Sequence, residues 1–134
     1  MFMLPSRYEA FGLVIIEAMT LGIKLANKIK ADVVFGTDPD SDRLGVAIRN
    51  DKGEFINLSG NQVGVLLTDY VLKRLSEDGV LASDGVIIKS FVSTGMIKPI
   101  CEDYGVKLVE VPVGFKYIGE KIARYEKDKS KQFI

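Results

Sequence analysis

The chain has 134 residues, 47% of them hydrophobic, and its 18 basic and 18 acidic side chains cancel. These totals fit one folded domain or two incomplete ones, and the balanced charge gives no reason to expect a nucleic-acid partner. We expect no membrane partner, because every apolar run is far shorter than the ~18 residues that a membrane span needs. The complete absence of histidine excludes histidine-dependent acid–base chemistry and histidine-containing zinc sites.

The first third of the chain predicts a βαβ unit. Met1 to Leu4 fits a short strand, and a turn-rich loop leads into a helix over residues 13–29, where apolar residues recur at helical spacing. Gly22 in the middle of that helix costs up to about 1 kcal/mol relative to alanine. A short apolar run at 33–35 reads as a buried strand, and a right-handed crossover would join it to the first strand.

Three aspartates, Asp38, Asp40 and Asp42, follow this strand at alternate positions. Alternate residues of an extended chain point the same way, so the three carboxylates are able to converge. Such a group favours a hard cation, and Mg²⁺ in particular. Arg43 comes directly after and suits a phosphate oxygen. A plain turn explains the same residues, so local chemistry leaves both interpretations open; an EF-hand is excluded because Arg43 stands where glycine is needed.

The remainder alternates strands and helices in a pattern typical of α/β proteins. The predicted elements are strands at 44–49 and 54–58 joined as a hairpin, a helix at 61–75, a strand at 86–88, a helix from about 93 to 104, a strand at 106–111, a loop at 112–115 and a helix from 117 to about 125.

The loop around Gly114 and Lys116 has the residue types of a phosphate site. Glycine lets the backbone approach a ligand closely, and lysine supplies a point charge. On spacing alone, a strand-to-helix turn with an exposed lysine is the more ordinary interpretation of the loop. Lys89 follows a buried strand and by default would point to water.

Several motifs, taken in order, resemble the α-D-phosphohexomutases, the family of phosphoglucomutase and phosphomannomutase. The resemblance covers about residues 22–134. Its motifs are Asp38-Pro39-Asp40-Ser41-Asp42-Arg43, Gly60-Asn61-Gln62, Lys89-Ser90-Phe91-Val92-Ser93-Thr94 and Val113-Gly114-Phe115-Lys116-Tyr117-Ile118-Gly119-Glu120-Lys121. The resemblance implies that the three aspartates hold Mg²⁺, and that Arg43, Lys89, Gly114 and Lys116 face a hexose phosphate.

Other parts of that family's pattern are missing from this sequence. It contains neither the phosphoserine loop, nor the Gly-Glu-x-Ser-Gly sugar-recognition loop, nor the C-terminal phosphate clamp. Three carboxylates and a metal cannot transfer a phosphoryl group without a positioned nucleophile. We therefore expect no catalytic residue in this chain and no turnover, although the family catalyses intramolecular phosphoryl transfer.

Residues 1–22 resemble a different family, the GT-B glycosyltransferases of the glycogen synthase type. Glu9 and Glu17 have that family's Glu-x₇-Glu spacing, which implies a nucleotide-sugar site at a helix start. The alternative is a strand–loop–helix unit with two solvated glutamates. The seam near residues 21–23 predicts a chimera of the two families, with a ligand-free structural chimera as a further interpretation.

We therefore expect an α/β protein with layered sheets and flanking helices: a βαβ unit plus hairpin at 1–58, and an incomplete phosphohexomutase third domain at 59–134. The expected cofactor is Mg²⁺ and the expected partner a hexose phosphate. Cys101, the single cysteine, cannot form an internal disulfide, and no signal peptide is recognisable, which together favour the cytoplasm. An open sheet edge favours a homodimer.

Overall fold

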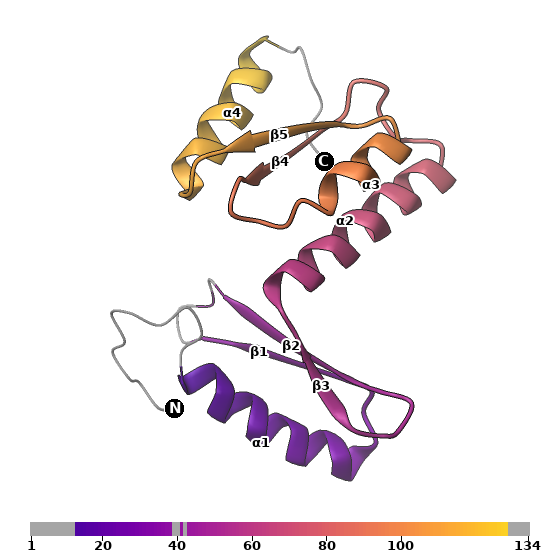
Figure 1. The fold of residues 1–134 in the computed structure, drawn as a ribbon, viewed down its shortest axis with the longest axis vertical. Helices are drawn as coiled ribbons and strands as arrows, with labels where there is room; N and C mark the ends of the chain where they lie inside the picture. Colours follow the sequence, from indigo (N-terminus) through magenta and orange to yellow (C-terminus); the bar gives the residue numbers. More distant parts are fainter. Residues whose placement is uncertain (1–12, 39–40, 42, 129–134) are drawn as a thin grey trace. The chain divides into compact units, whose positions relative to one another are not determined.

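The computed structural model describes residues 13–38, 41 and 43–128, the first five of these by their backbone only. The chain divides into two compact units, residues 1–63 and 64–134, and each is described by itself. The α/β class predicted from the sequence is confirmed, with sheets and flanking helices in both units (Figure 1).

The N-terminal unit is a helix packed on a three-stranded antiparallel sheet. Helix α1 (Leu13–Ile29) is continuous through the predicted seam, and the strands β1 (Val33–Thr37), β2 (Leu44–Arg49) and β3 (Phe55–Leu58) lie in the order β1-β2-β3. The predicted hairpin is confirmed, and β1 also pairs antiparallel with β2. The strand predicted at 2–4 lies outside the described residues, so the βαβ unit stays a prediction.

The core of this unit lies where helix α1 closely approaches strands β1 and β2. Met19 and Ala26 of α1 pack on Val34 of β1 and Ala47 of β2. At Gly22 an added Cβ would lie 2.9 Å from Val34 Cγ1. Gly22 has a low helix propensity, but because it lacks a Cβ it allows helix α1 to approach Val34 of β1 closely.

The C-terminal unit is built around a parallel pair of strands. Its elements are α2 (Gly60–Glu77, which begins four residues before the unit boundary), β4 (Val86–Ser90), α3 (Ile97–Asp103), β5 (Lys107–Val111) and α4 (Phe115–Asp128). Strands β4 and β5 pair in parallel over their full length, α3 packs on β5, and α4 packs on β4. The buried apolar residues of the unit are Leu72, Val86, Ile97, Cys101, Val106 and Val111.

Local signals explain where these helices begin and end. Ser59 and Gln62 form a capping box at the start of α2, since the Ser59 amide donates to Gln62 Oε1 at 2.8 Å and the Gln62 amide donates to Ser59 Oγ at 3.3 Å. Gly79 and Gly105, with φ of 69° and 68°, follow α2 and α3. Helix α3 begins at Ile97, later than predicted, with Pro99 in its first turn, where proline is tolerated.

Candidate functional site

Asp38 is a buried carboxylate at the end of β1, in the short loop that turns the chain from β1 into β2. Its side chain is 4% exposed, and Arg43 Nε donates to its Oδ2 at 2.6 Å. The Arg43 backbone amide donates to the other oxygen at 3.2 Å, and the Ser41 amide donates to the Asp38 carbonyl at 3.0 Å. A buried carboxylate needs such compensation, so the loop holds Asp38 in one fixed orientation.

The other two predicted metal ligands, Asp40 and Asp42, lie outside the described residues. Within the part of the chain that the structure describes, no three acidic, cysteine or histidine side chains gather closely enough to hold a metal. Asp38 is thus the one predicted ligand whose geometry is known: an oriented carboxylate beside a guanidinium. The metal site as a whole stays a prediction.

In the C-terminal unit, three of the predicted site residues belong to the carboxyl edge of the parallel strands. Ser90 of β4 pairs with Val111 of β5, and the Phe91 amide donates to the Val111 carbonyl at 3.0 Å. The loops that follow β4 and β5 therefore start side by side. Ligands of open α/β sheets bind at this edge, and Lys89, Gly114 and Lys116 come from these two strand ends.

Gly114 and Lys116 form the turn from β5 into α4. Gly114 has φ 128°, a conformation that side chains disfavour, and its carbonyl accepts from the Tyr117 amide at 3.1 Å. Helix α4 begins at the next residue, so its first backbone N–H groups lie in this turn. The exposed Lys116 carries its Nζ 4.7 Å from the Tyr117 ring centroid, a cation–π distance.

Lys89 does not point to water, so the default expectation for this residue is wrong. Its side chain is 6% exposed, and Nζ donates to Glu110 Oε1 at 2.6 Å, to the Ser93 carbonyl at 3.2 Å and to the Ser90 carbonyl at 3.4 Å. An ammonium has three donors, and these acceptors use them. Lys89 thereby ties the loop after β4 to β5, beneath the edge where Lys116 lies.

Sequence reasoning missed the apolar side chains of the same two loops. Five large hydrophobic side chains there are at least 59% exposed: Phe91, Val92, Met96, Val113 and Phe115. The sequence could have indicated these residues, because each follows the end of a predicted strand or stands at the start of a helix. The loops that follow β4 and β5 thus carry exposed apolar side chains, a residue type that is common in ligand sites.

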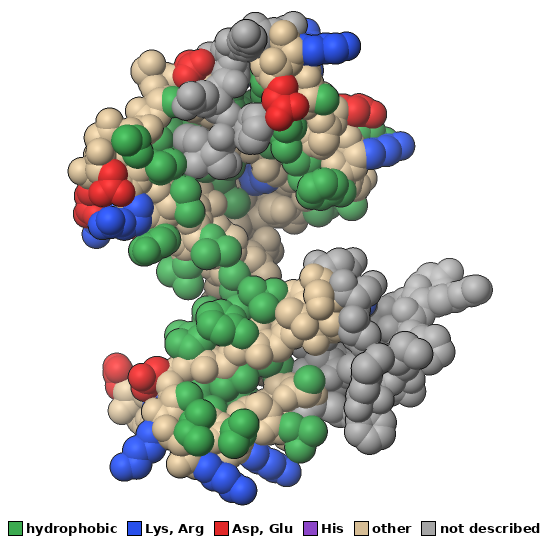
Figure 2. Space-filling view, turned by 180° about the vertical axis from the view of Figure 1, so that it is seen from behind, with side chains coloured by type: hydrophobic (Ala, Val, Ile, Leu, Met, Phe, Trp, Pro, Cys, Tyr) green, Lys and Arg blue, Asp and Glu red, His purple; other side chains and the backbone are tan. Residues whose placement is uncertain are grey.

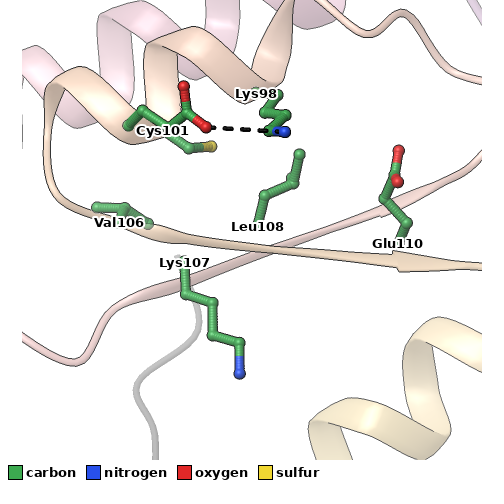
Figure 3. A pocket seen from close by; sticks show the side chains of 7 residues that line it. Lys98, Cys101, Val106, Lys107, Leu108 and Glu110 are labelled. Atoms are coloured by element: carbon green, nitrogen blue, oxygen red, sulfur yellow. Dashed lines mark ion pairs between the residues drawn. The ribbon is translucent and has the colours of Figure 1, made fainter.

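A separate pocket of about 420 Å³ lies between α3 and β5 (Figure 3). Two lysines and two glutamates are among the residues that line it, and Lys98 forms an ion pair with Glu102 at 3.9 Å. Burial raises the pKa of the Cys101 thiol in its wall and thereby disfavours the reactive thiolate. The pocket thus adds no reactive group to the candidate site.

Comparison with known proteins places this α/β chain among the sugar-phosphate mutases by family. The family model described as phosphoglucomutase/phosphomannomutase, alpha/beta/alpha domain III, matches residues 59–128, more than half of the chain. A phosphoglucomutase of Staphylococcus epidermidis is 40% identical over 106 residues, which cover 79% of this chain and 19% of that protein. A phosphomannomutase of Mycoplasmoides pirum is 38% identical over 117 residues, covering 87% of this chain and 20% of that protein.

The chain therefore belongs to the phosphoglucomutase/phosphomannomutase family, and it spans about a fifth of the length of these curated relatives. A crystal structure of an apo N-acetylglucosamine-phosphate mutase, a member of the alpha-D-phosphohexomutase superfamily, matches with a TM-score of 0.51 at 16% identity. It covers 66% of this chain and 20% of that one, and at this identity the likeness concerns the fold alone.

The resemblance of residues 1–22 to glycosyltransferases stays a prediction. Glu9 lies outside the described residues, and of Glu17 only the backbone, within α1, is described. Among the described residues, no helix combines the length and the hydrophobicity that crossing a membrane requires.

Proposed function

We propose that this chain is a portion of a sugar-phosphate mutase that binds the phosphate of a hexose phosphate at the turn from β5 into α4, retains the family's Mg²⁺ loop, and does not turn over by itself. Membership of the phosphoglucomutase/phosphomannomutase family supports the substrate class. The share of its relatives that the chain spans, about a fifth, supports the absence of turnover.

The observation that carries the proposal is the conformation of Gly114 at the start of α4. Its φ of 128° bends the chain so that the first turn of a helix begins directly beyond the end of a parallel strand. The N-terminus of a helix favours an anion through its unpaired N–H groups and its dipole, and Lys116 adds a full positive charge beside them. These features together suit a phosphate monoester.

The test is a titration of the ¹⁵N-labelled protein with glucose 1-phosphate, observed by NMR. We expect amide shifts at Gly114 to Tyr117, and at least tenfold weaker binding in Lys116→Ala. The matched control is Lys127→Ala, which removes a lysine from the last turn of the same helix and should leave binding unchanged. Equal binding by the three proteins, or shifts confined to other residues, would contradict the proposal.

For the metal, the residues concerned are Asp38, Asp40 and Asp42, and their chemistry fits Mg²⁺. Mg²⁺ binds oxygen ligands and is commonly held by a few carboxylates together with substrate phosphate. Asp38 supports this fit, because its buried carboxylate is held in a fixed orientation beside Arg43. A bound Mg²⁺ would supply positive charge that stabilises a transferring phosphoryl group. Arg43 would then help to orient the Asp38 carboxylate toward the metal.

A calorimetric titration with Mg²⁺ and Mn²⁺ tests the loop. We expect binding at a sub-millimolar dissociation constant, or roughly 4 kcal/mol or more of binding free energy, with loss of binding in Asp40→Ala. Asp51→Ala, in the turn between β2 and β3, is the control and should bind normally. Binding that survives Asp40→Ala would place the metal elsewhere.

Turnover is tested separately, with the pure chain, glucose 1-phosphate, Mg²⁺ and a coupled assay for glucose 6-phosphate. We expect none. Conversion by the chain alone would refute the statement about turnover while leaving the binding sites in place.

A further inference from the structure

A cavity of about 200 Å³ lies between the end of strand β5 and helix α4. Its lining residues come from the end of the strand and from one stripe of the helix: Val111, Pro112, Tyr117, Glu120, Lys121 and Arg124. The four helical residues follow one another at intervals of three or four positions or fewer, so they share one side of α4. The cavity therefore belongs to the same two elements that form the turn around Gly114.

Tyr117 connects this cavity with the turn for which we propose phosphate binding. A Cβ added at Gly114 would lie 3.6 Å from Tyr117 Cδ2, and Lys116 Nζ lies 4.7 Å from the centroid of the Tyr117 ring. The same tyrosine lines the cavity. A phosphate held at Gly114 and Lys116 would thus lie next to the cavity, and a group joined to that phosphate by one ester bond would reach it.

The chemistry of the lining suits a sugar ring better than a second anion. Hydroxyl groups both donate and accept hydrogen bonds, the Glu120 carboxylate accepts them, and the Lys121 ammonium donates them. The aromatic ring of Tyr117 offers apolar contact to the C–H groups of a sugar. A second anion would be repelled by Glu120. Figure 2 agrees with this, because on the face that it shows the acidic and basic side chains of the C-terminal unit are interspersed.

The size of the cavity fits a single ring. Sites for drug-sized ligands have volumes of about 300–1,000 Å³, so a cavity of about 200 Å³ accepts a smaller ligand, such as one monosaccharide. In sites of this kind a few polar groups fix the orientation of the ligand, and apolar side chains supply the remaining contacts. Glu120 and Lys121 are placed to be those polar groups.

We propose that this cavity holds the hexose ring of the sugar phosphate, with Glu120 and Lys121 hydrogen-bonded to its hydroxyl groups. The inference rests on the phosphate site proposed above, because the bound phosphate brings the ring to the cavity. Glu120 and Lys121 contact the sugar and not the phosphate. They therefore determine specificity, since they distinguish a hexose phosphate from a phosphate monoester that has no ring.

The experiment compares three probes in NMR titrations of the ¹⁵N-labelled chain: methyl phosphate, glucose and glucose 1-phosphate. We expect methyl phosphate to shift the amides of the turn around Gly114 and to leave those of Glu120 and Lys121 in place. Glucose 1-phosphate should shift both sets and bind roughly tenfold more tightly than methyl phosphate, because it adds hydrogen bonds to the hydroxyl groups. Glucose alone should shift the amides of Glu120 and Lys121 at high concentration.

The decisive variant is Glu120→Ala, and its matched control is Glu126→Ala, which removes an exposed acid from the same helix. Charge alone would make both phosphates bind more tightly once an acid is removed. We expect instead that Glu120→Ala binds glucose 1-phosphate roughly tenfold more weakly and binds methyl phosphate no more weakly than the wild type. Glu120→Gln, which keeps an uncharged hydrogen bond, should lose less, and Glu126→Ala should behave as the wild type.

The outcomes separate this inference from the proposed function. Equal affinity of the wild type for methyl phosphate and glucose 1-phosphate, or a Glu120→Ala variant that keeps the preference for the sugar phosphate, would overturn the sugar site and leave the phosphate site standing. A wild type that binds neither phosphate would refute the phosphate site. Glucose shifts that disappear in Glu120→Ala would then still support the cavity as a sugar site, and their absence would overturn both proposals.

Discussion

Among the described residues, each unit buries one charged side chain at the end of a strand and leaves the ion-pair partner half exposed, but the signs are opposite. In the N-terminal unit the buried group is Asp38, 4% exposed, and its partner Arg43 is 45% exposed. In the C-terminal unit the buried group is Lys89, 6% exposed, and its partner Glu110 is 55% exposed. A strand end thus fixes an anion in one unit and a cation in the other.

The hydrogen bonds around the two buried charges distinguish Asp38, a candidate metal ligand, from Lys89, a structural group. Asp38 accepts hydrogen bonds from the side chain and the backbone amide of Arg43, and carboxylate oxygens are the ligands that a hard cation prefers. The Lys89 ammonium group donates its three hydrogen bonds to Glu110 and to two loop carbonyls. The buried charge of the N-terminal unit thus lies in the loop for which we propose Mg²⁺ binding, while the buried charge of the C-terminal unit holds the loop that follows β4.

The largest predicted effect concerns the core that supports the C-terminal unit. Leu72 of α2 is fully buried, so Leu72→Ala should lower the free energy of unfolding by about 2–5 kcal/mol. Urea unfolding followed by NMR should show amides of β4 and β5 lost at lower urea than those of β1 and β2. The control is Leu66→Ala, at a residue of the same helix that is 57% exposed, for which we expect a change within about 0.5 kcal/mol. Loss of both sets of amides at the same urea concentration in Leu72→Ala would contradict this expectation.

The next effect tests whether Lys89 is structural. Lys89→Met removes three hydrogen bonds from a buried site and should destabilise the C-terminal unit by about 2 kcal/mol, with faster amide exchange at residues 91–95. Lys98→Met is the matched control, because it removes the exposed Lys98–Glu102 pair on α3, and exposed pairs contribute about 0–1 kcal/mol. Equal stability of the two variants would show that the hydrogen bonds of Lys89 carry little energy.

A smaller effect tests the close packing of the N-terminal unit. In Gly22→Ala the new Cβ would lie 2.9 Å from Val34 Cγ1. The cost of overpacking, about 1–3 kcal/mol, should exceed the gain of about 1 kcal/mol in helix propensity, and the unit should lose roughly 1 kcal/mol. At Gly64 of α2 an added Cβ meets nothing within 4 Å, so Gly64→Ala should stabilise the chain. A stabilised Gly22→Ala variant would show that α1 and β1 separate easily.

The smallest predicted effect is a pH dependence of the free energy of unfolding of the C-terminal unit. Burial raises the pKa of the Cys101 thiol above its ordinary value. The stabilisation that the protonated Cys101 thiol contributes is therefore complete below the pKa of a cysteine in the unfolded chain, about 8.5. This stabilisation is lost as the pH rises through the pKa of the thiol in the folded state. The stability difference between wild type and Cys101→Ala should shrink in alkaline solution, and Ellman's reagent should react slowly until the protein unfolds. Rapid reaction of the native protein would contradict the burial of the thiol.

Local patterns identified much of this fold because they report on short-range chemistry. Helical spacing predicted α1 within the bounds that the structure has, the turn at residues 51–53 predicted the hairpin of β2 and β3, and glycines marked the ends of α2 and α3. The residue types at Gly114 and Lys116 also singled out the turn at the carboxyl edge. Each of these signals involves residues only a few positions apart, whose geometry the backbone itself sets.

The sequence by itself determined the α/β class, the family and the presence of a carboxylate loop after β1. The tertiary structure alone decided that Lys89 is buried against Glu110 and that Gly22 serves the contact with Val34. The physical reason is distance along the chain: Lys89 and Glu110 are 21 positions apart, and only the parallel register of β4 and β5 brings them together. Burial and pairing depend on which elements pack, and no local pattern contains that information.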